Sequence, residues 1–245
     1  MKFVARTDIG KRRPYNEDSY LIDDKIGLFV IADGMGGHNA GDVASQLAVD
    51  VFRKWTESFP QIDSFVSKKS AILNTLNQLA VDANTRVYTE SKAHPTRHGM
   101  GTTLIAGFCQ NNLVSYVHIG DSRIYLIRQG EISQITIDHS HVQEMVNKRI
   151  ITTEEARVHQ NRHIINRAVG LNHTVVADTD QFEVFTDDIL LVCTDGLHDM
   201  IASDREIAEL IISSSNLESA GKALTKTALN YGGSDNITLI LIQIT

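Results

Sequence analysis

The sequence has few cysteines, few prolines and no long hydrophobic segment. Its two cysteines, Cys109 and Cys193, lie in apolar, strand-like runs and have no Cys or His neighbour at metal-ligand spacing. We therefore expect both cysteines to be small buried side chains of a protein in a reducing compartment. Their positions argue against a disulfide and against a zinc site. No segment approaches the length needed to cross a bilayer, and residues 1–6 contain no apolar core of a signal peptide. We therefore expect a cytoplasmic protein.

Positive charge is also scarce. The chain has 23 Lys and Arg against 30 Asp and Glu, which gives a net charge of −7. This balance argues against nucleic acid and membranes as partners, because both favour a basic surface. No internal repeat, low-complexity tract or Pro/Gly-rich linker divides the chain, and 245 residues with 42% hydrophobic content can form a full core. We expect a single domain over residues 1–245.

Two kinds of hydrophobic pattern alternate in blocks along the chain. Apolar residues recur at helical spacing in residues 43–55 and 72–87, and further helices are expected from about residues 152, 203 and 217. Strand-like runs occur at residues 3–9, 20–22, 26–32, 102–108, 113–119, 123–127, 132–135, 181–185, 189–193 and 237–244. Short turns between many of these runs indicate antiparallel neighbours. The fold class predicted is α+β: a four-layer αββα arrangement in which two antiparallel sheets pack face to face under helices on both outer faces.

Aspartates stand at the ends of several strand-like runs, namely Asp33, Asp121, Asp195 and Asp235. Glycines at positions 34, 36 and 37 follow the first of them, and a backbone without Cβ atoms can approach a ligand closely. One such turn alone would be read as a tight turn with a solvated aspartate. Four of them suggest one shared site.

The loop at residues 10–18 adds candidates for the same site. It contains Arg13, Glu17 and Asp18, and the strand that follows at once would carry the two acids toward the sheet. Carboxylates without nearby Cys or His ligands favour hard cations such as Mg²⁺ or Mn²⁺. Two such ions about 3.5–4 Å apart can activate a water for in-line attack on phosphorus, and an arginine can hold the phosphoryl oxygens. No Walker-type loop, Cys nucleophile in an Arg-rich loop or Ser-His-Asp set needs to be invoked, so the residues favour hydrolysis of a phosphate ester.

Eight short motifs resemble those of one family, the metal-dependent (PPM, or type 2C) protein serine/threonine phosphatases, in its compact bacterial branch. Each motif alone is weak evidence, but their order and spacing cover nearly the whole chain. They are Arg13-Pro14-Tyr15-Asn16-Glu17-Asp18, Asp33-Gly34-Met35-Gly36-Gly37-His38, Gly101-Thr102-Thr103, Gly120-Asp121-Ser122-Arg123, Asp138-His139-Ser140, Arg167-Ala168-Val169-Gly170, Thr194-Asp195-Gly196-Leu197 and Asp235-Asn236.

The resemblance implies hydrolysis of phosphoserine and phosphothreonine at a binuclear Mn²⁺ or Mg²⁺ centre, without a phosphoenzyme intermediate. It implies that one ion is held by Asp33, Asp195 and Asp235. Asp33 would bridge to a second ion, which is bound also through the Gly34 carbonyl and served by Glu17 and Asp18 directly or through water. Asp121 resembles the family's ligand for a third, weaker ion.

Arg13 takes the family's phosphate-binding position, and residues 138–170 resemble the flap beside the site that shapes substrate choice. Two positions depart from the family pattern. Met35 stands where many eukaryotic members have a proton-donating His, which leaves His38 or a water as candidates for the general acid, and we favour a structural role for His38. His198 replaces a small polar residue, and its role is left open.

Two other functions remain compatible with the same acids. One is a phosphatase-like domain that has lost catalysis and binds phosphopeptides, which intact Asp33, Asp195 and Asp235 argue against. The other is a two-metal phosphohydrolase that acts on a small metabolite or nucleotide. The partners expected for a protein phosphatase are phosphoserine and phosphothreonine proteins, including a serine/threonine kinase or its substrates.

Overall fold

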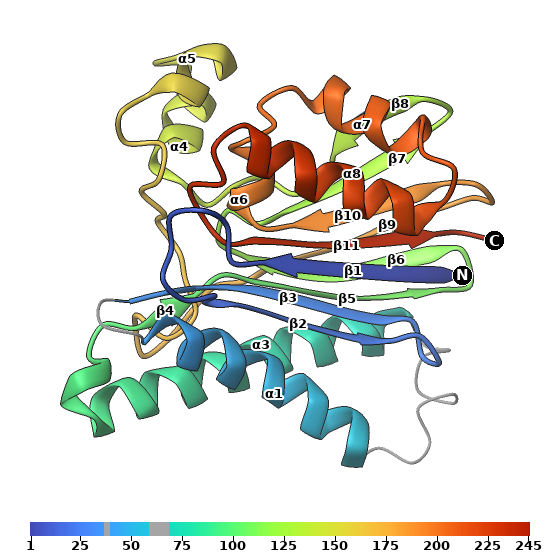
Figure 1. Ribbon diagram of the computed structural model, residues 1–245. Coiled ribbons are helices and arrows are strands. Elements are labelled where there is room, and N and C mark those ends of the chain that lie inside the picture. Colours follow the sequence, from blue (N-terminus) through green and yellow to red (C-terminus); the bar gives the residue numbers. More distant parts are fainter. Residues whose placement is uncertain (37–39, 59–68) are drawn as a thin grey trace.

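The computed structural model describes residues 1–36, 40–58 and 69–245. His38 and Gly37 of the glycine-rich motif lie outside the described residues, so the proposed roles of His38 stay untested. Two antiparallel sheets form the centre of the molecule, and helices cover both of their outer faces (Figure 1). This arrangement confirms the predicted four-layer αββα fold class. Within the described part of the chain, no helix combines the length and the apolar composition that crossing a bilayer requires.

The strand order places the first and last strands side by side. One sheet has the order β1 (Lys2–Asp8), β11 (Ile237–Gln243), β10 (Ile189–Cys193), β7 (Arg123–Arg128) and β8 (Glu131–Gln134). The other has the order β2 (Asp18–Asp23), β3 (Leu28–Met35), β5 (Leu104–Gln110), β6 (Leu113–Ile119) and β9 (Asp178–Glu183), with the short β4 (Gly101–Thr102) paired to β3. Residues far apart in the sequence therefore meet at the same end of the two sheets.

Helices on each outer face complete the layers (Figure 1). On one face lie α1 (Gly41–Ser58) and α3 (Lys69–Ala93), followed by the 3₁₀ turn η1 (Pro95–Arg97). On the other lie α7 (Asp204–Ile212), α8 (Leu217–Asn230) and the short α6 (Asp195–His198). The helices α4 (His141–Asn147) and α5 (Thr153–Val158) extend from one end of the sandwich and belong to the predicted flap.

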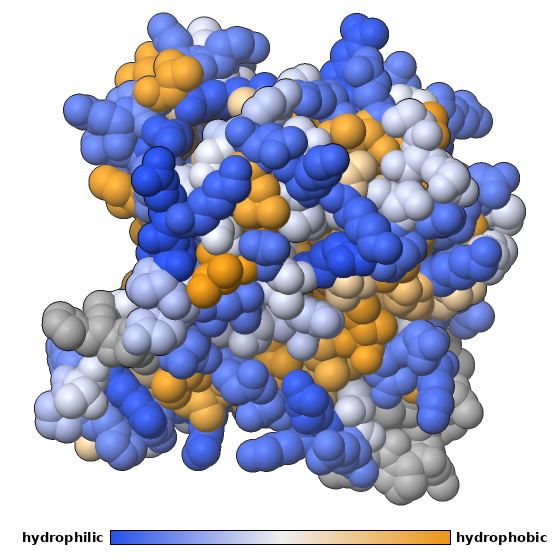
Figure 2. All heavy atoms as spheres, in the orientation of Figure 1, coloured by the Kyte–Doolittle hydropathy of each residue, from blue (hydrophilic) through white to orange (hydrophobic). Residues whose placement is uncertain are grey.

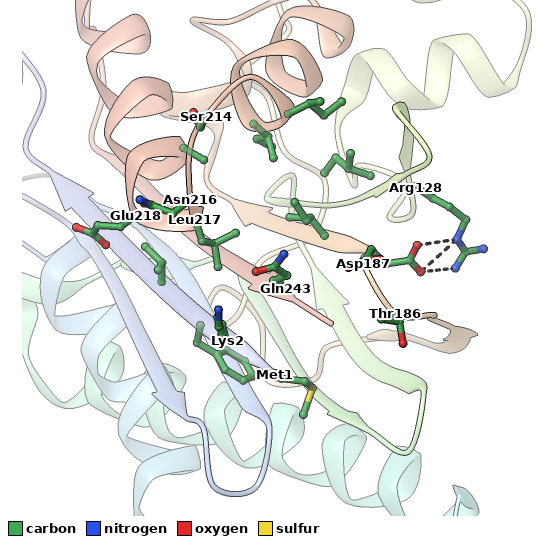
Figure 3. A pocket seen from close by; sticks show the side chains of 18 of the residues that line it. Met1, Lys2, Arg128, Thr186, Asp187, Ser214, Asn216, Leu217, Glu218 and Gln243 are labelled. Atoms are coloured by element: carbon green, nitrogen blue, oxygen red, sulfur yellow. Dashed lines mark hydrogen bonds and ion pairs between the residues drawn. The ribbon is translucent and has the colours of Figure 1, made fainter. Parts of the chain in front are cut away.

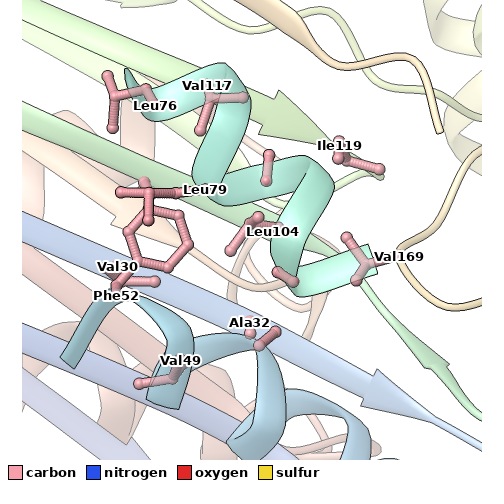
Figure 4. Close-up of a cluster of buried hydrophobic side chains, with 14 of the residues drawn as sticks. Val30, Ala32, Val49, Phe52, Leu76, Leu79, Leu104, Val117, Ile119 and Val169 are labelled. Atoms are coloured by element: carbon pink, nitrogen blue, oxygen red, sulfur yellow. The ribbon is translucent and has the colours of Figure 1, made fainter. Parts of the chain in front are cut away.

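Strand β3 shows why its sequence is apolar without alternation. Leu28 and Val30 pack under α1 and α3, whereas Phe29 and Ile31 pack against the other sheet, and all four are completely buried. Both faces of the strand are therefore covered, and a strand covered on both faces needs apolar residues at every position. Figure 4 shows the helix side of this core, where side chains of α1 and α3 meet those of the sheet, among them Val49, Phe52, Leu76, Leu79, Val30, Leu104 and Val117.

Several predicted boundaries differ from the structure. Strand β9 begins at Asp178 rather than at residue 181, because its polar first half pairs with β6 at an exposed edge. The flap contains two helices instead of the single one expected, since Ser140 caps α4 by accepting a hydrogen bond from the Gln143 amide. The predicted capping box of α5, formed by Thr152 and Glu155, is present.

The face of the molecule seen in Figure 2 is mostly hydrophilic. Hydrophobic side chains appear there in separate patches, one of them over α5 at the top left. Val158 and Ile150 of the flap are 82% and 62% exposed. Isolated apolar residues on a surface are ordinary in soluble domains.

Candidate active site

The predicted acids converge at one end of the sandwich, at the left of Figure 1. Asp33 lies near the end of β3, Asp195 begins α6 after β10, Asp121 follows β6, and Asp235 precedes β11. They share one cavity of about 510 Å³ with other predicted residues, namely Arg13, Glu17 and Gly34. Asp18 pairs with Asp33 in the register of β2 and β3 and does not line this cavity. The structure therefore brings most of the predicted residues to one cavity and places Asp18 beside Asp33.

The backbone of Asp33 is held by Thr102, the last residue of β4, and by Thr103, which follows it. The Asp33 amide donates to Thr103 Oγ1 at 3.0 Å, and the Thr103 amide donates to the Asp33 carbonyl at 2.8 Å. Thr102 Oγ1 donates to the same carbonyl at 2.8 Å. Thr103 Oγ1 also lies 2.8 Å from Ser122 Oγ, which ties Asp33 to the turn that contains Asp121. These bonds fix the direction in which the short Asp33 side chain leaves the strand.

Gly34 allows two other segments to pack against the end of β3. Its amide donates to the Glu17 carbonyl at 3.1 Å, and a Cβ at this position would lie 2.0 Å from the Gly41 carbonyl oxygen. The Gly41 amide at the start of α1 donates in turn to Glu17 Oε1 at 3.1 Å. The close approach that the sequence predicted here is to protein backbone, and it brings Glu17 and the start of α1 beside Asp33.

Two carboxylate oxygens at the site lack a donor. Asp18 Oδ2 accepts a hydrogen bond from Thr194 Oγ1 at 3.0 Å, but Asp18 Oδ1 has no hydrogen-bond partner among the described residues. Asp195 Oδ1 is equally inaccessible to water and likewise has no partner there. Inaccessible carboxylate oxygens are normally paired, so two that have no partner among the described residues fit a cation as their missing partner.

The pKa values of the acids reflect the same crowding. Burial raises the pKa of Asp33 well above its ordinary value, and the charges of Asp18 and Asp195 add to the rise. Burial also raises the pKa of Asp195 strongly, with Asp121 as the largest charged contributor. For Asp18 and Asp121, burial raises the pKa to about 7 and about 6 respectively. A divalent cation among these groups would remove the repulsion and keep them ionised.

This crowding predicts how the metal-free protein responds to pH. Asp18 has a pKa of about 7 in the folded state and about 3.9 when unfolded, so its ionisation destabilises the fold as pH rises through 7. Burial lowers the pKa of His118 to about 4 in the folded state, which makes the fold more stable as pH rises toward the unfolded pKa of about 6.5. This opposite effect ends at about pH 6.5. In chelator, Tm should therefore fall by several degrees from pH 6.5 to 8.5, as about 1 kcal/mol corresponds to roughly 2–4 °C.

Thermal unfolding of wild type and of Asp18→Asn, each with chelator and with excess Mn²⁺, measures this effect. The variant should have a shallower pH slope in chelator, and Asp33 and Asp195, whose pKa values burial also raises, supply the slope that remains. For wild type, the increase in Tm caused by Mn²⁺ should grow with pH, because ligands must be deprotonated to bind a metal. A metal-free Tm that rises over this pH range would contradict the assigned pKa of Asp18.

Arg13 lies at the mouth of the cavity. Its Nη2 donates to Asp235 Oδ2 at 2.6 Å, and its side chain is 46% exposed. The loop that carries it is fixed to the start of β11, because Asn236 Nδ2 donates to the carbonyls of Ile9 and Tyr15 at 2.9 Å each. The rigid loop therefore presents one cation at the edge of an acidic pocket, in reach of solvent.

The comparison with known families decides the identity. The family model described as protein phosphatase 2C matches residues 11–230. The chain belongs to this family. It is a metal-dependent protein serine/threonine phosphatase, and its substrates are phosphoserine and phosphothreonine proteins.

Relatives of the phosphatase are found among bacterial proteins. The serine/threonine phosphatase stp of Listeria innocua is 34% identical over 97% of this chain and 94% of its own length. The serine/threonine protein phosphatase PstP of Mycobacterium tuberculosis is 38% identical over all of this chain, which spans 45% of that protein. The solved catalytic domain of PstP in complex with two manganese ions has a TM-score of 0.86 and 36% identity, covering 100% of this chain and 98% of that one.

The flap of the phosphatase contributes side chains that the sequence did not single out. His163 and Ile165 line the cavity with the acids. One nitrogen of His163 lies within 4.8 Å of oxygens from Asp195 and Asp199, and the three side chains together form a group with metal-ligand spacing. The sequence identified the segment only as polar and rich in His and Arg, because the contact of His163 depends on how the flap folds back.

Two further histidines are buried. His118 stacks on His139 with ring centroids 4.6 Å apart, and its Nε2 has no hydrogen-bond partner among the described residues. His198 is also buried, and its Nε2 lies 3.1 Å from the Asp121 carbonyl oxygen. It faces the backbone behind the acids, and it does not line the cavity.

A larger cavity of about 1240 Å³ lies at the opposite end of the sandwich, near the two termini (Figure 3). It has an apolar floor that includes Leu217, and its rim carries Lys2, Asn216 and Gln243. The carboxylate of Asp188 in its wall is already paired with Arg128 at 2.7 Å. Size alone therefore does not mark the active site of the phosphatase, which is identified by its unpaired carboxylates.

Proposed function

We propose that the acids at the end of the sandwich are the metal ligands of this phosphatase. Asp33, Asp195 and Asp235 would hold one Mn²⁺ or Mg²⁺ ion, and Asp33 and the Gly34 carbonyl would hold a second, with Glu17 and Asp18 in support. The observation that carries the proposal is that one inaccessible oxygen each of Asp18 and Asp195 has no partner among the residues that the structure describes. The PstP catalytic domain, a relative, is described in complex with two manganese ions.

Two bound ions would supply a metal-activated water as the nucleophile for phosphorus, and this chemistry needs no phosphorylated residue. Arg13 holds the phosphoryl oxygens with the guanidinium nitrogens that do not face Asp235. The Thr102 and Thr103 hydrogen bonds keep Asp33 in place, and electrostatic preorganisation of this kind costs no rearrangement during the reaction. Met35 lines the cavity and has no proton to donate, which leaves a water or His38 as the candidate for protonating the leaving oxygen.

Other assignments follow from the same residues. Asp121 holds a third, weaker ion, and residues 138–170 form a flap that influences which substrate segment fits the cavity.

The chain acts as one domain over residues 1–245. It works in the cytoplasm, consistent with two buried thiols that are not joined in a disulfide, and it reverses a serine/threonine kinase.

Phosphate release from a phosphothreonine peptide and from p-nitrophenyl phosphate, each with Mn²⁺ or with chelator, tests the function. We expect Mn²⁺-dependent turnover of both and a higher kcat/KM for the peptide. Chelation should abolish both reactions, and Mn²⁺ should restore them.

Two results would favour the alternatives. A domain that only binds phosphopeptides would bind the peptide and turn over neither substrate. An enzyme for small metabolites would hydrolyse p-nitrophenyl phosphate and leave the peptide intact. Full activity in chelator, with the metal content of the sample measured, would contradict the proposal that hydrolysis depends on a metal ion.

A further inference from the structure

Two buried histidines flank the turn that contains Asp121. The turn follows β6, and His139 and His198 reach it from positions 19 and 77 residues along the chain. His139 lies at the base of the flap, and His198 is the last residue of α6. The turn therefore connects the flap, α6 and the acid pocket.

His139 holds both polar backbone groups of Gly120. Its amide donates to the Gly120 carbonyl at 2.8 Å, and the Gly120 amide donates to its Nδ1 at 3.0 Å. Since an amide can only donate, Nδ1 carries no proton and Nε2 carries the ring hydrogen. That Nε2 lies 3.1 Å from Asp178 Oδ2, and Asp178 is held in turn by Arg167 at 2.6 Å. The ring is thus fixed at both nitrogens.

His198 holds the next peptide group. Its Nε2 lies 3.1 Å from the Asp121 carbonyl oxygen, and because a carbonyl only accepts, this nitrogen is the donor. Its side chain is 3% exposed, and its Nδ1 lies 3.3 Å from Asp199 Oδ1. Asp195 and His198 are the first and last residues of α6. One imidazole therefore links the backbone of Asp121 to the helix that presents Asp195.

A clamp of this kind is needed because the turn itself is unusual. Gly120 has φ +110°, in the region that favours glycine, so the chain here has more conformational freedom than at other residues. Asp121 has a short side chain, and the backbone on either side decides where its carboxylate points. We propose that His139 and His198 are positioning residues that together hold the Gly120–Asp121 turn so that Asp121 faces Asp33 and Asp195. This inference rests on the proposed metal-binding role of Asp121.

The test separates the hydrogen bond of His198 from its volume. His198→Leu fills similar space without a donor, whereas His198→Gln can donate an amide hydrogen to the same carbonyl. Losing one hydrogen bond to the turn should raise the Mn²⁺ concentration for half-maximal activity about tenfold in the Leu variant and less than about threefold in the Gln variant. Mn²⁺ binding by calorimetry, without substrate, should show the same order. KM for the phosphopeptide should change little.

A double-mutant cycle shows whether the effect passes through Asp121. In an Asp121→Asn background, His198→Leu should change neither Mn²⁺ binding nor kcat further, since the group that it positions is already gone. If His198→Leu does not fold, the same cycle is run with His139→Leu, which cannot accept a hydrogen bond from the Gly120 amide. His139→Asn is then the conservative variant, because its side-chain carbonyl can still accept that bond. Equal losses in both backgrounds would overturn the proposal.

Gln110→Ala provides a matched control. Its Nε2 donates to the Ile26 carbonyl at 2.5 Å, at the other end of the same sheet from the acids. Its loss should lower Tm and leave the Mn²⁺ dependence unchanged. If His198→Leu behaves like this control, the histidine is only structural and the proposal fails. That outcome differs from failure of the proposed function, in which wild type itself would show no dependence on Mn²⁺.

Discussion

Asp195→Asn should remove nearly all turnover and most of the stabilisation by Mn²⁺. The substitution keeps the size of the side chain but replaces a carboxylate that has an inaccessible, unpaired oxygen with a neutral amide. Changing an outer-shell partner of a metal ligand already costs roughly 10–100-fold, so changing the ligand should cost at least about a hundredfold in kcat/KM. Activity with Mn²⁺ on a phosphothreonine peptide measures this loss.

The same variant should unfold at a similar or higher temperature than wild type in chelator. Removing one charge from the group relieves the repulsion that raises the pKa values of Asp33 and Asp195. Wild type should gain about 2.7 kcal/mol from Mn²⁺ at a hundredfold excess over Kd, which corresponds to roughly 5–10 °C at 2–4 °C per kcal/mol. The variant should show little of this increase.

Asp188→Asn is the matched control, because Asp188 lies just before the other end of β10 and pairs with Arg128 at 2.7 Å. Its loss should lower the Tm but leave the Mn²⁺-induced increase and most of the activity intact. If Asp195→Asn kept wild-type activity, the acids at the strand ends would be ordinary solvated turns, and the ligand set proposed for them would be wrong.

The parts of the fold that were predictable from sequence are those with a strong local pattern. The apolar runs within β3 and β11 and the apolar stripes of α1 and α3 report burial directly, because neighbours in the sequence share one environment. The acids are predictable for a related reason. A carboxylate at the end of an apolar strand is a local feature of the sequence, and its repetition at several strand ends indicates one shared site.

Other features depend on contacts between distant segments and had no local signal. Gly34 is packed against the Gly41 carbonyl, and a pattern near Gly34 does not reveal this contact. In the same way, His198 contacts the turn at Asp121, which lies 77 residues earlier in the chain. The first half of β9 contains Asp178 and Asp180, which are poor strand formers, and it is held in the sheet by pairing with β6. The flap side chain His163 reaches the pocket only through the path of the whole segment.

Gly196→Ala should be one of the most disruptive single-methyl changes near the site. Gly196 follows Asp195 in α6, and a Cβ there would lie 1.9 Å from the Asn236 carbonyl oxygen and 3.4 Å from Asp235 Cβ. Backbone cannot move aside like a flexible side chain, so α6 and the start of β11 must separate. Overpacking of this kind costs about 3 kcal/mol or more. The same shift moves Asp195 away from Asp235, and a displacement of about 1 Å costs on the order of a hundredfold in rate.

Chemical unfolding with and without Mn²⁺, together with kcat/KM, separates the two effects. Gly221→Ala is the control, since a Cβ in this helical position meets Arg6 Cγ at an ordinary 3.5 Å. That variant should be neutral or more stable by about 0.5–1 kcal/mol, because alanine replaces glycine within a helix. Gly196→Ala should bind Mn²⁺ more weakly even at temperatures where it remains folded. A Gly196→Ala enzyme with wild-type Mn²⁺ affinity would mean that α6 can shift without moving Asp195, and the close packing of α6 on Asn236 would then have no part in building the metal site.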